Sequence, residues 1–222
     1  MNFLTFDVAE WFQLPENPTK EDAWLTYEPR LEANAERILR ILDEMNAKAT
    51  FFVTDWVARH HPETVRMIAR KYEVGLFIER RQTVEKEDVM SLKNKIKSLV
   101  ERLEDIGGRK IRYARTTEFA KSGCDAEIVK VLNECGIGAV NDVICRNFRL
   151  IPYFLLKRKI KNSDNVLLDI ALRDFDVSQP MLRELRMSCK IKYYIGLQEA
   201  ERKLRKLLKD FRFEDDLGCI FR

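Results

Sequence analysis

Histidine is scarce in this sequence. Two occur in 222 residues, and they are adjacent, at His60 and His61. Such a pair beside a proline indicates a helix start more than a metal site. The five cysteines are widely spaced and include no Cys-x-x-Cys pair, which argues against both a zinc knuckle and a disulfide scaffold. We therefore expect reduced thiols.

Long apolar runs are also missing. The longest covers residues 150–156 and contains a proline, whereas a membrane helix needs about 20 apolar residues. The first residues reach a carboxylate at Asp7, so they show neither the basic start nor the apolar stretch of a signal peptide. These absences predict no membrane span and a cytoplasmic location.

No charge of one sign dominates the composition. The 40 basic and 36 acidic residues leave a net charge of +4, which is too weakly basic to predict nucleic-acid binding. Basic runs at 157–161 and 202–206 flank apolar residues and are typical of solvated helix faces. Nothing resembles a linker, and the length fits one core, so we predict a single domain over 1–222.

Short apolar runs rich in β-branched and aromatic residues alternate with longer segments of helical period. This pattern is typical of βα units around a mostly parallel sheet. Helices are predicted over 31–45 and 89–103. Pro62 indicates the start of a further helix, and Gly107-Gly108 and Gly136 indicate the C-terminal ends of helices. The predicted strands cover residues 3–6, 49–53, 74–78, 111–113, 139–143 and 166–170.

This number of strands is too small for a regular eight-stranded barrel. The sequence therefore predicts an α/β fold: a distorted, incomplete (β/α) barrel of about six to seven mostly parallel strands. In such folds the chemistry lies at the carboxyl ends of the strands. Here those ends lie near Asp7, Thr54, 79–81, 114–116 and Ala171.

Five segments, in this order, carry a resemblance to a known family. They are FLTFDVAEWF at 3–12, KATFFV at 48–53, WVARHHPE at 56–63 leading to YEVG at 72–75, RDFD at 173–176, and YIGL at 194–197. Together they resemble the polysaccharide deacetylases of carbohydrate esterase family four, with their nodulation-protein-B-like homology domain. The similarity is greatest to the bacterial exopolysaccharide branch, which implies a helical C-terminal extension over about 181–222.

Members of this family remove acetyl groups from sugars with a divalent metal, usually zinc, held by one acidic residue and two histidines. The metal activates a water molecule and a separate carboxylate takes its proton. The resemblance implies Asp7 as that catalytic base. It places Ala9, Phe77 and Arg81 at the metal-ligand positions, and none of these side chains can bind zinc. We therefore expect no bound metal or other cofactor.

Further roles follow from the same resemblance. Arg115 matches the arginine that orients the base, and Trp11 and Phe119 match substrate-binding positions, while the general-acid histidine is replaced by Ala171. An unpaired buried carboxylate is unfavourable. We therefore predict that Arg81 or Arg115 forms an ion pair with Asp7 and that Phe77 packs into the core. The alternative is that Arg81 points into solvent as one of many surface cations.

Three functions remain open at this point. The first is a catalytically inactive relative of the deacetylases that retains glycan or partner binding. The second is an active deacetylase of N-acetylated sugars, whose metal would need oxygen ligands from Asp7, Glu10 and Glu79, a set that suits magnesium or manganese. The third is an interaction module that uses the basic amphipathic helix at 199–211.

Overall fold

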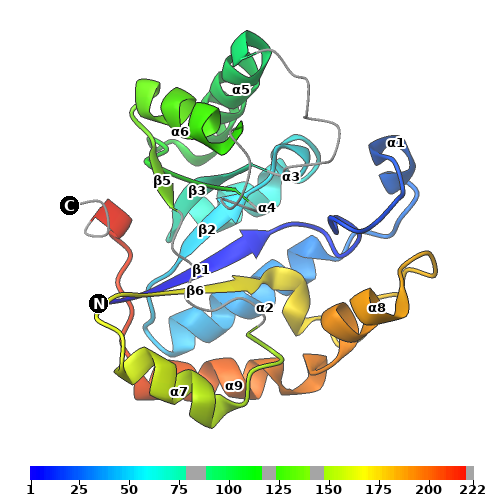
Figure 1. Ribbon diagram of the computed structural model, residues 1–222, viewed down its shortest axis with the longest axis vertical. Helices are drawn as coiled ribbons and strands as arrows, with labels where there is room; N and C mark the ends of the chain where they lie inside the picture. Colours follow the sequence, from blue (N-terminus) through cyan, green and yellow to red (C-terminus); the bar gives the residue numbers. More distant parts are fainter. Residues whose placement is uncertain (79–88, 117–123, 141–147, 219–222) are drawn as a thin grey trace. The chain divides into compact units, whose positions relative to one another are not determined.

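The computed structural model describes residues 1–78, 89–116, 124–140 and 148–218 (Figure 1). The chain forms two compact units. The first comprises Met1–Ala49 and Val143–Asp215, and the second comprises Thr50–Asp142 and Asp216–Arg222. Each unit joins segments that are far apart in the sequence, so neither corresponds to one continuous stretch of chain.

The first unit is built on two parallel strands, β1 (Asn2–Val8) and β6 (Val166–Ala171), which run side by side (Figure 1). Most residues of both strands are buried, and most of the buried ones are apolar, as expected of parallel strands covered on both faces. The 3₁₀ helix η2 (Leu172–Phe175) continues directly from β6 and contacts β1. The helices of this unit are α1 (Glu21–Trp24), α2 (Leu31–Glu44), α7 (Tyr153–Lys161), α8 (Met187–Tyr194) and α9 (Leu197–Asp210).

The second unit is a parallel sheet in the order β2-β3-β4-β5. Its strands are β2 (Thr50–Val53), β3 (Glu73–Ile78), β4 (Tyr113–Thr116) and β5 (Gly138–Val140). Parallel neighbouring strands need a crossover connection, and one or two helices provide it between each pair of strands here. These helices are α3 (Asp55–His60), α4 (Pro62–Ala69), α5 (Val89–Gly107) and α6 (Cys124–Glu134).

Helix boundaries follow the local signals in the sequence. Pro62 is the first residue of α4, and the Thr54 side chain caps α3 by accepting a hydrogen bond from the Val57 N–H at 3.2 Å. Gly108 and Gly136 follow α5 and α6 with φ of 65° and 72°, the left-handed conformation that ends a helix. The ends at Pro62, Gly108 and Gly136 were predicted from the sequence, whereas the Thr54 cap was not.

The predicted fold class is confirmed. Every strand pair within the two units is parallel, the strands alternate with helices, and the six described strands are fewer than the eight of a closed barrel. The fourth strand was predicted two residues too early, at 111–113. The apolar run ends there, but strand pairing begins at Tyr113 and extends through the polar end of β4. No helix in the described ranges is long and apolar enough to cross a membrane.

Gly75 provides a test of the packing in the second unit. A methyl group at this position would lie 2.7 Å from Cε1 of Phe52 on β2 and 2.9 Å from the carbonyl oxygen of Tyr113 on β4. We expect Gly75→Ala to lower the free energy of unfolding by about 1–3 kcal/mol, because the strands must move apart. Urea denaturation measures this, with Gly107→Ala as the control.

The control substitution meets only the Cβ of Ala69, at 3.2 Å, and alanine favours helix over glycine. Gly107→Ala should therefore change the free energy of unfolding only slightly, whether it raises or lowers it. Equal unfolding free energies for Gly75→Ala and the native chain would contradict the packing described here.

Candidate functional site

Asp7 lies near the carboxyl end of β1, where the sequence predicted a catalytic base. It is half-buried, and its Cα partner on the neighbouring strand is Ala171, the last residue of β6. The two positions that the family resemblance assigns to base and general acid are therefore adjacent in the structure. Asp7 carries a carboxylate, but Ala171 carries only a methyl group. Asp7 can therefore accept a proton, but Ala171 cannot donate one.

The residues after β1 differ sharply in what their side chains can do. Ala9 is 4% exposed and offers no ligand atom. Glu10 is 1% exposed, and its carboxylate accepts hydrogen bonds from the backbone N–H groups of Arg30 at 3.0 and 3.2 Å and of Leu31 at 3.1 Å. These N–H groups belong to the first turn of α2, whose own N-cap residue makes no side-chain cap. Glu10 therefore caps α2 from 20 residues upstream.

Burial raises the pKa of the Glu10 carboxyl above its ordinary value of 4.5, and hydrogen bonds from the backbone of Arg30, Leu31 and Trp11 lower it by less. The carboxylate nonetheless suits its position, because a helix N-terminus carries partial positive charge. The carboxylate oxygens of Glu10 accept hydrogen bonds from the first N–H groups of α2. The sequence analysis missed this role. A cap so distant in the sequence leaves no local signal.

Arg115 and Phe77 lie together in the second unit, on neighbouring strands β4 and β3, as Cα partners. Arg115 is 3% exposed, and its guanidinium carbon lies 5.3 Å from the centre of the Phe77 ring and 5.0 Å from that of Phe52. Such contacts stabilise a buried cation. Phe77 is itself 7% exposed and therefore part of the core, as predicted.

Trp11 lines a cavity of about 310 Å³ in the first unit. Its ring is almost buried and contacts Tyr27 edge to face, with ring centres 5.3 Å apart. Its indole N–H donates to the carbonyl oxygen of Glu28 at 3.0 Å, so the hydrogen-bonding edge faces the protein. The other lining residues are Thr26, Tyr27, Glu28, Pro180, Met181, Leu182, Arg183 and Glu184.

The acidic residues of the RDFD segment make buried ion pairs. Asp174 pairs with Nε of Arg149 at 2.8 Å, with side chains 11% and 5% exposed. Asp176 accepts from Nη2 of Arg30 at 3.2 Å and from Ser178. Burial raises the pKa of Asp176, but the hydrogen bonds from Arg30 and Ser178 outweigh it and hold the pKa below its ordinary value. These carboxylates anchor η2 to its surroundings.

Among the described residues, no group of three histidine, cysteine, aspartate or glutamate side chains is placed to hold a metal ion. The described side chains at the family's ligand positions, Ala9 and Phe77, do not fit a divalent metal. His60 stacks on Trp56 with ring centres 4.3 Å apart, and its Nδ1 lies 2.8 Å from the Trp56 carbonyl oxygen.

Three residues named from the sequence, Glu79, Arg81 and Phe119, lie outside the described residues. An ion pair of Asp7 with Arg81 or Arg115 stays a prediction, because Arg81 is not described and Asp7 and Arg115 belong to different units. The catalytic and substrate-binding roles of Asp7, Arg115, Trp11 and Phe119 also remain predictions.

Fold and site together define an incomplete (β/α) barrel with a carboxylate at the carboxyl end of its first strand. The chain belongs to the polysaccharide deacetylase family, whose sequence profile matches residues 16–140. A second profile, for a domain of unknown function, matches residues 145–216. No curated protein is significantly similar in sequence.

Solved structures of related fold include both named deacetylases and a pseudoenzyme. A Mycobacterium smegmatis protein described as a candidate polysaccharide deacetylase superposes with a TM-score of 0.66 and 16% identity, over 99% of this chain and 87% of that one. A pseudoenzyme of carbohydrate esterase family four from Bacillus anthracis superposes with a TM-score of 0.57 and 16% identity, over 96% of this chain. This chain spans 62% of the pseudoenzyme's length. A mutant of that pseudoenzyme with restored enzymatic activity superposes with a TM-score of 0.59 and 14% identity, over 95% and 62% of the two chains.

The raised pKa of Glu10 predicts how its contribution to stability depends on pH. The folded chain binds a proton at this site more readily than the unfolded chain, so the stabilisation is greatest below pH 4.5 and falls as pH rises through the folded pKa. The native chain should therefore lose stability relative to Glu10→Gln, whose amide does not titrate, as pH rises from 4.5 through the raised pKa of the folded chain. Denaturant unfolding at several pH values measures the difference. An advantage of the native chain that grows with pH would contradict the prediction.

Proposed function

We propose that this protein is a catalytically inactive member of the polysaccharide deacetylase family that retains the ability to bind glycans. One observation carries the proposal: the described side chains at the family's metal-ligand positions are a buried alanine, Ala9, and a buried phenylalanine, Phe77. Neither has a ligand atom. Without a metal, the family chemistry lacks both its Lewis acid and its activated water.

The use of Glu10 supports this proposal. It is the nearest acidic residue to the alanine, but its carboxylate serves the first N–H groups of α2. Moving it to a metal would leave buried helix donors without an acceptor, which costs about 1–3 kcal/mol for each group. The alternative of an active enzyme with an oxygen-ligand site needs this carboxylate. Family membership favours that alternative, and the position of Glu10 weighs against it.

Free thiols at Cys135 and Cys189 are consistent with the cytoplasmic location that we propose. We also propose that the chain is one domain whose extension, from about 181 to 222, is specific to the exopolysaccharide branch. A role beside the enzymes of exopolysaccharide metabolism would follow from that assignment.

The purified protein should bind no stoichiometric zinc and should release no acetate from an N-acetylglucosamine oligomer above background, because the ligands that would activate water are missing. Metal analysis and an acetate assay measure both. Acetate release that disappears in Asp7→Asn would overturn the proposal and establish the alternative.

A positive control for the same assay is the triple variant Ala9→Asp, Phe77→His, Arg81→His, which recreates the family's ligand set. The existence of an active mutant of the Bacillus anthracis pseudoenzyme encourages this design. We expect the triple variant to gain zinc binding. If it binds no zinc although it folds, the positions assigned to the metal ligands are wrong.

Glycan binding is predicted at the cavity beside Trp11, where aromatic rings and polar side chains occur together, a combination that suits sugars. Tyr27→Ala should weaken binding of an N-acetylglucosamine oligomer about tenfold, which corresponds to about 1.4 kcal/mol. Isothermal titration calorimetry measures this. Leu25→Ala, at an exposed residue that does not line the cavity, is the control and should bind normally. Equal losses in the two variants would rule out this binding site.

A further inference from the structure

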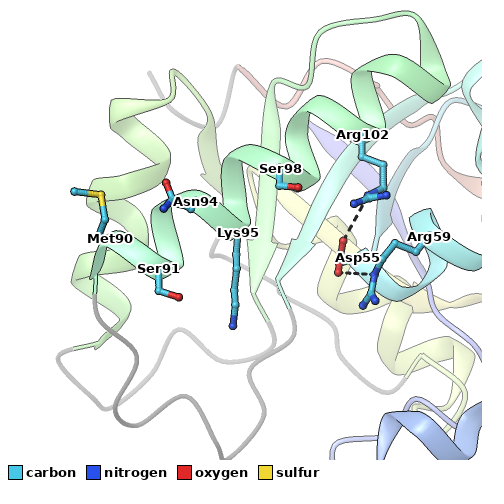
Figure 2. Close-up of a pocket in the computed structure, with 8 residues that line it drawn as sticks. All are labelled: Asp55, Arg59, Met90, Ser91, Asn94, Lys95, Ser98 and Arg102. Carbon is cyan, nitrogen blue, oxygen red and sulfur yellow. Dashed lines mark ion pairs between the residues drawn. The ribbon is translucent and has the colours of Figure 1, made fainter.

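Basic side chains in the two units occur in different surroundings. In the second unit, the Asp55 carboxylate lies 2.9 Å from Nε of Arg59 and 3.8 Å from Nε of Arg102, beside an open groove of about 670 Å³ (Figure 2). The second of these ion pairs joins α3 to α5, so this cluster has a structural role. In the first unit, basic side chains instead gather on the outer surface of α7 and α9.

These two helices concentrate the positive charge of the chain. The sequence of α7 contains four basic residues and no acidic one, and that of α9 contains five basic and three acidic residues. Together the helices carry a net charge of +6 (nine minus three), whereas the whole chain carries +4, so the rest of the chain is net negative. The helices contain the two basic runs at 157–161 and 202–206.

The helices α7 and α9 lie side by side in the first unit (Figure 1). The Tyr153 hydroxyl and the Lys157 ammonium of α7 each donate a hydrogen bond to the carboxylate of Asp210 on α9, both at 2.6 Å. The Lys206 ammonium of α9 lies 4.5 Å from the centre of the Tyr153 ring. Two basic runs that are far apart in the sequence therefore form one surface.

The outer face of α7 also presents bulky apolar side chains. Phe154 and Leu155 are 69% and 45% exposed, whereas the next residue, Leu156, is buried. The exposed Arg158 follows Phe154 by four residues and Leu155 by three, so it lies beside both on the helix surface, and the exposed Lys161 lies about one turn further. Apolar and basic side chains therefore share this face.

The outer face of α9 continues that surface. Arg202, Lys206 and Lys209 are exposed and recur at spacings of four and three residues, so they share one face of the helix. Arg202 pairs with Glu199, which lowers the net charge at that end of the face. Lys206 contacts the first residue of α7, so the basic surface runs from one helix to the other without a break.

We propose that the outer face of α7 and α9 docks on the surface of an anionic lipid bilayer. Phe154 and Leu155 enter the interface and leave water, while Arg158, Lys161 and the cations of α9 face the anionic headgroups. The long aliphatic stems of the basic side chains allow their charged ends to stay at the headgroups as the helix settles on the surface.

The exposed apolar pair is the reason to favour lipid over another polyanion. Nucleic acid would match the cations, but binding to its phosphate backbone depends on charge and gives Leu155 no apolar partner. An acidic protein segment would likewise match the charge first. A lipid surface offers both an anionic layer and an apolar layer beneath it, in the order that this face requires.

This inference does not rest on the proposed function. The cavity beside Trp11 is lined by residues of 11–28 and 180–184, whereas the lipid-facing side chains belong to α7 and α9. A chain that binds no vesicles but binds the N-acetylglucosamine oligomer would contradict only this inference. A chain that binds vesicles but not the oligomer would contradict only the proposed glycan site.

The test is sedimentation of the full chain with phosphatidylcholine vesicles that contain or lack phosphatidylserine. We expect the double variant Arg158→Gln, Lys161→Gln to bind the anionic vesicles at least tenfold more weakly than the native chain, because each basic residue at such a surface strengthens binding about fivefold. The matched control is Lys20→Gln, Arg186→Gln, which removes the same charge from exposed residues of the same unit that precede α1 and α8. Binding of the native chain should weaken as ionic strength rises from about 0.01 M to about 0.15 M, which shortens the screening length from about 30 Å to about 8 Å.

A second variant tests the apolar contribution separately. Phe154→Ser, Leu155→Ser should also bind the anionic vesicles at least tenfold more weakly, but it should keep the dependence on ionic strength, because its charges are unchanged. Leu25→Ser is the control, since this side chain is 67% exposed in the same unit but lies on neither helix. All of the substituted residues are exposed, and thermal unfolding verifies that each variant folds.

Two soluble polyanions complete the design, a polyglutamate for acidic protein segments and a duplex oligonucleotide for phosphate chains. Weaker binding of both double variants to anionic vesicles, with normal binding of the controls, would support the inference. It is overturned if the native chain does not prefer the vesicles with phosphatidylserine, or if either double variant binds them as tightly as its control. It is also overturned if a soluble polyanion binds more tightly than the vesicles and depends on Arg158 and Lys161 in the same way.

Discussion

The carboxylate of Glu10 determines the arrangement of the first unit. It lies just beyond β1 and accepts hydrogen bonds from the first turn of α2, so one side chain fixes both the exit of the strand and the entry of the helix. The first N–H groups of a helix need acceptors, and this helix has none at its own N-cap. The segment that follows Asp7 is therefore held by the start of α2, which limits where its side chains can point.

Buried ion pairs also hold the segment that follows β6. Asp174 and Asp176 are both largely buried, and each is matched by an arginine, Arg149 and Arg30. Breaking a buried pair by removing one partner is strongly destabilising, because a charge is left without compensation. Acidic residues that resemble a functional motif in the sequence therefore tie η2 to α2 and to the segment before α7.

Membership of a deacetylase family and the loss of its chemistry that we propose are compatible for a physical reason. The fold depends on apolar strands, amphipathic helices and helix caps, none of which requires a metal. Phe77 illustrates this, because its ring fills core space beside the guanidinium of Arg115 at a position where the family resemblance places a metal ligand. A side chain at the end of a strand can change from ligand to core residue while strand pairing is preserved.

The sequence by itself determined the α/β class, the parallel strands and the helix ends, because these depend on local periodicity and on residues such as Pro62 and Gly136. It also identified the family, since five short segments occur in the correct order. Only the tertiary structure decided that Glu10 caps a helix 20 residues away, that Asp7 lies opposite Ala171, and that Asp55 gathers two arginines in a groove. These are contacts between elements distant in the chain, and sequence periodicity describes only the face of an element, not the partner that it meets.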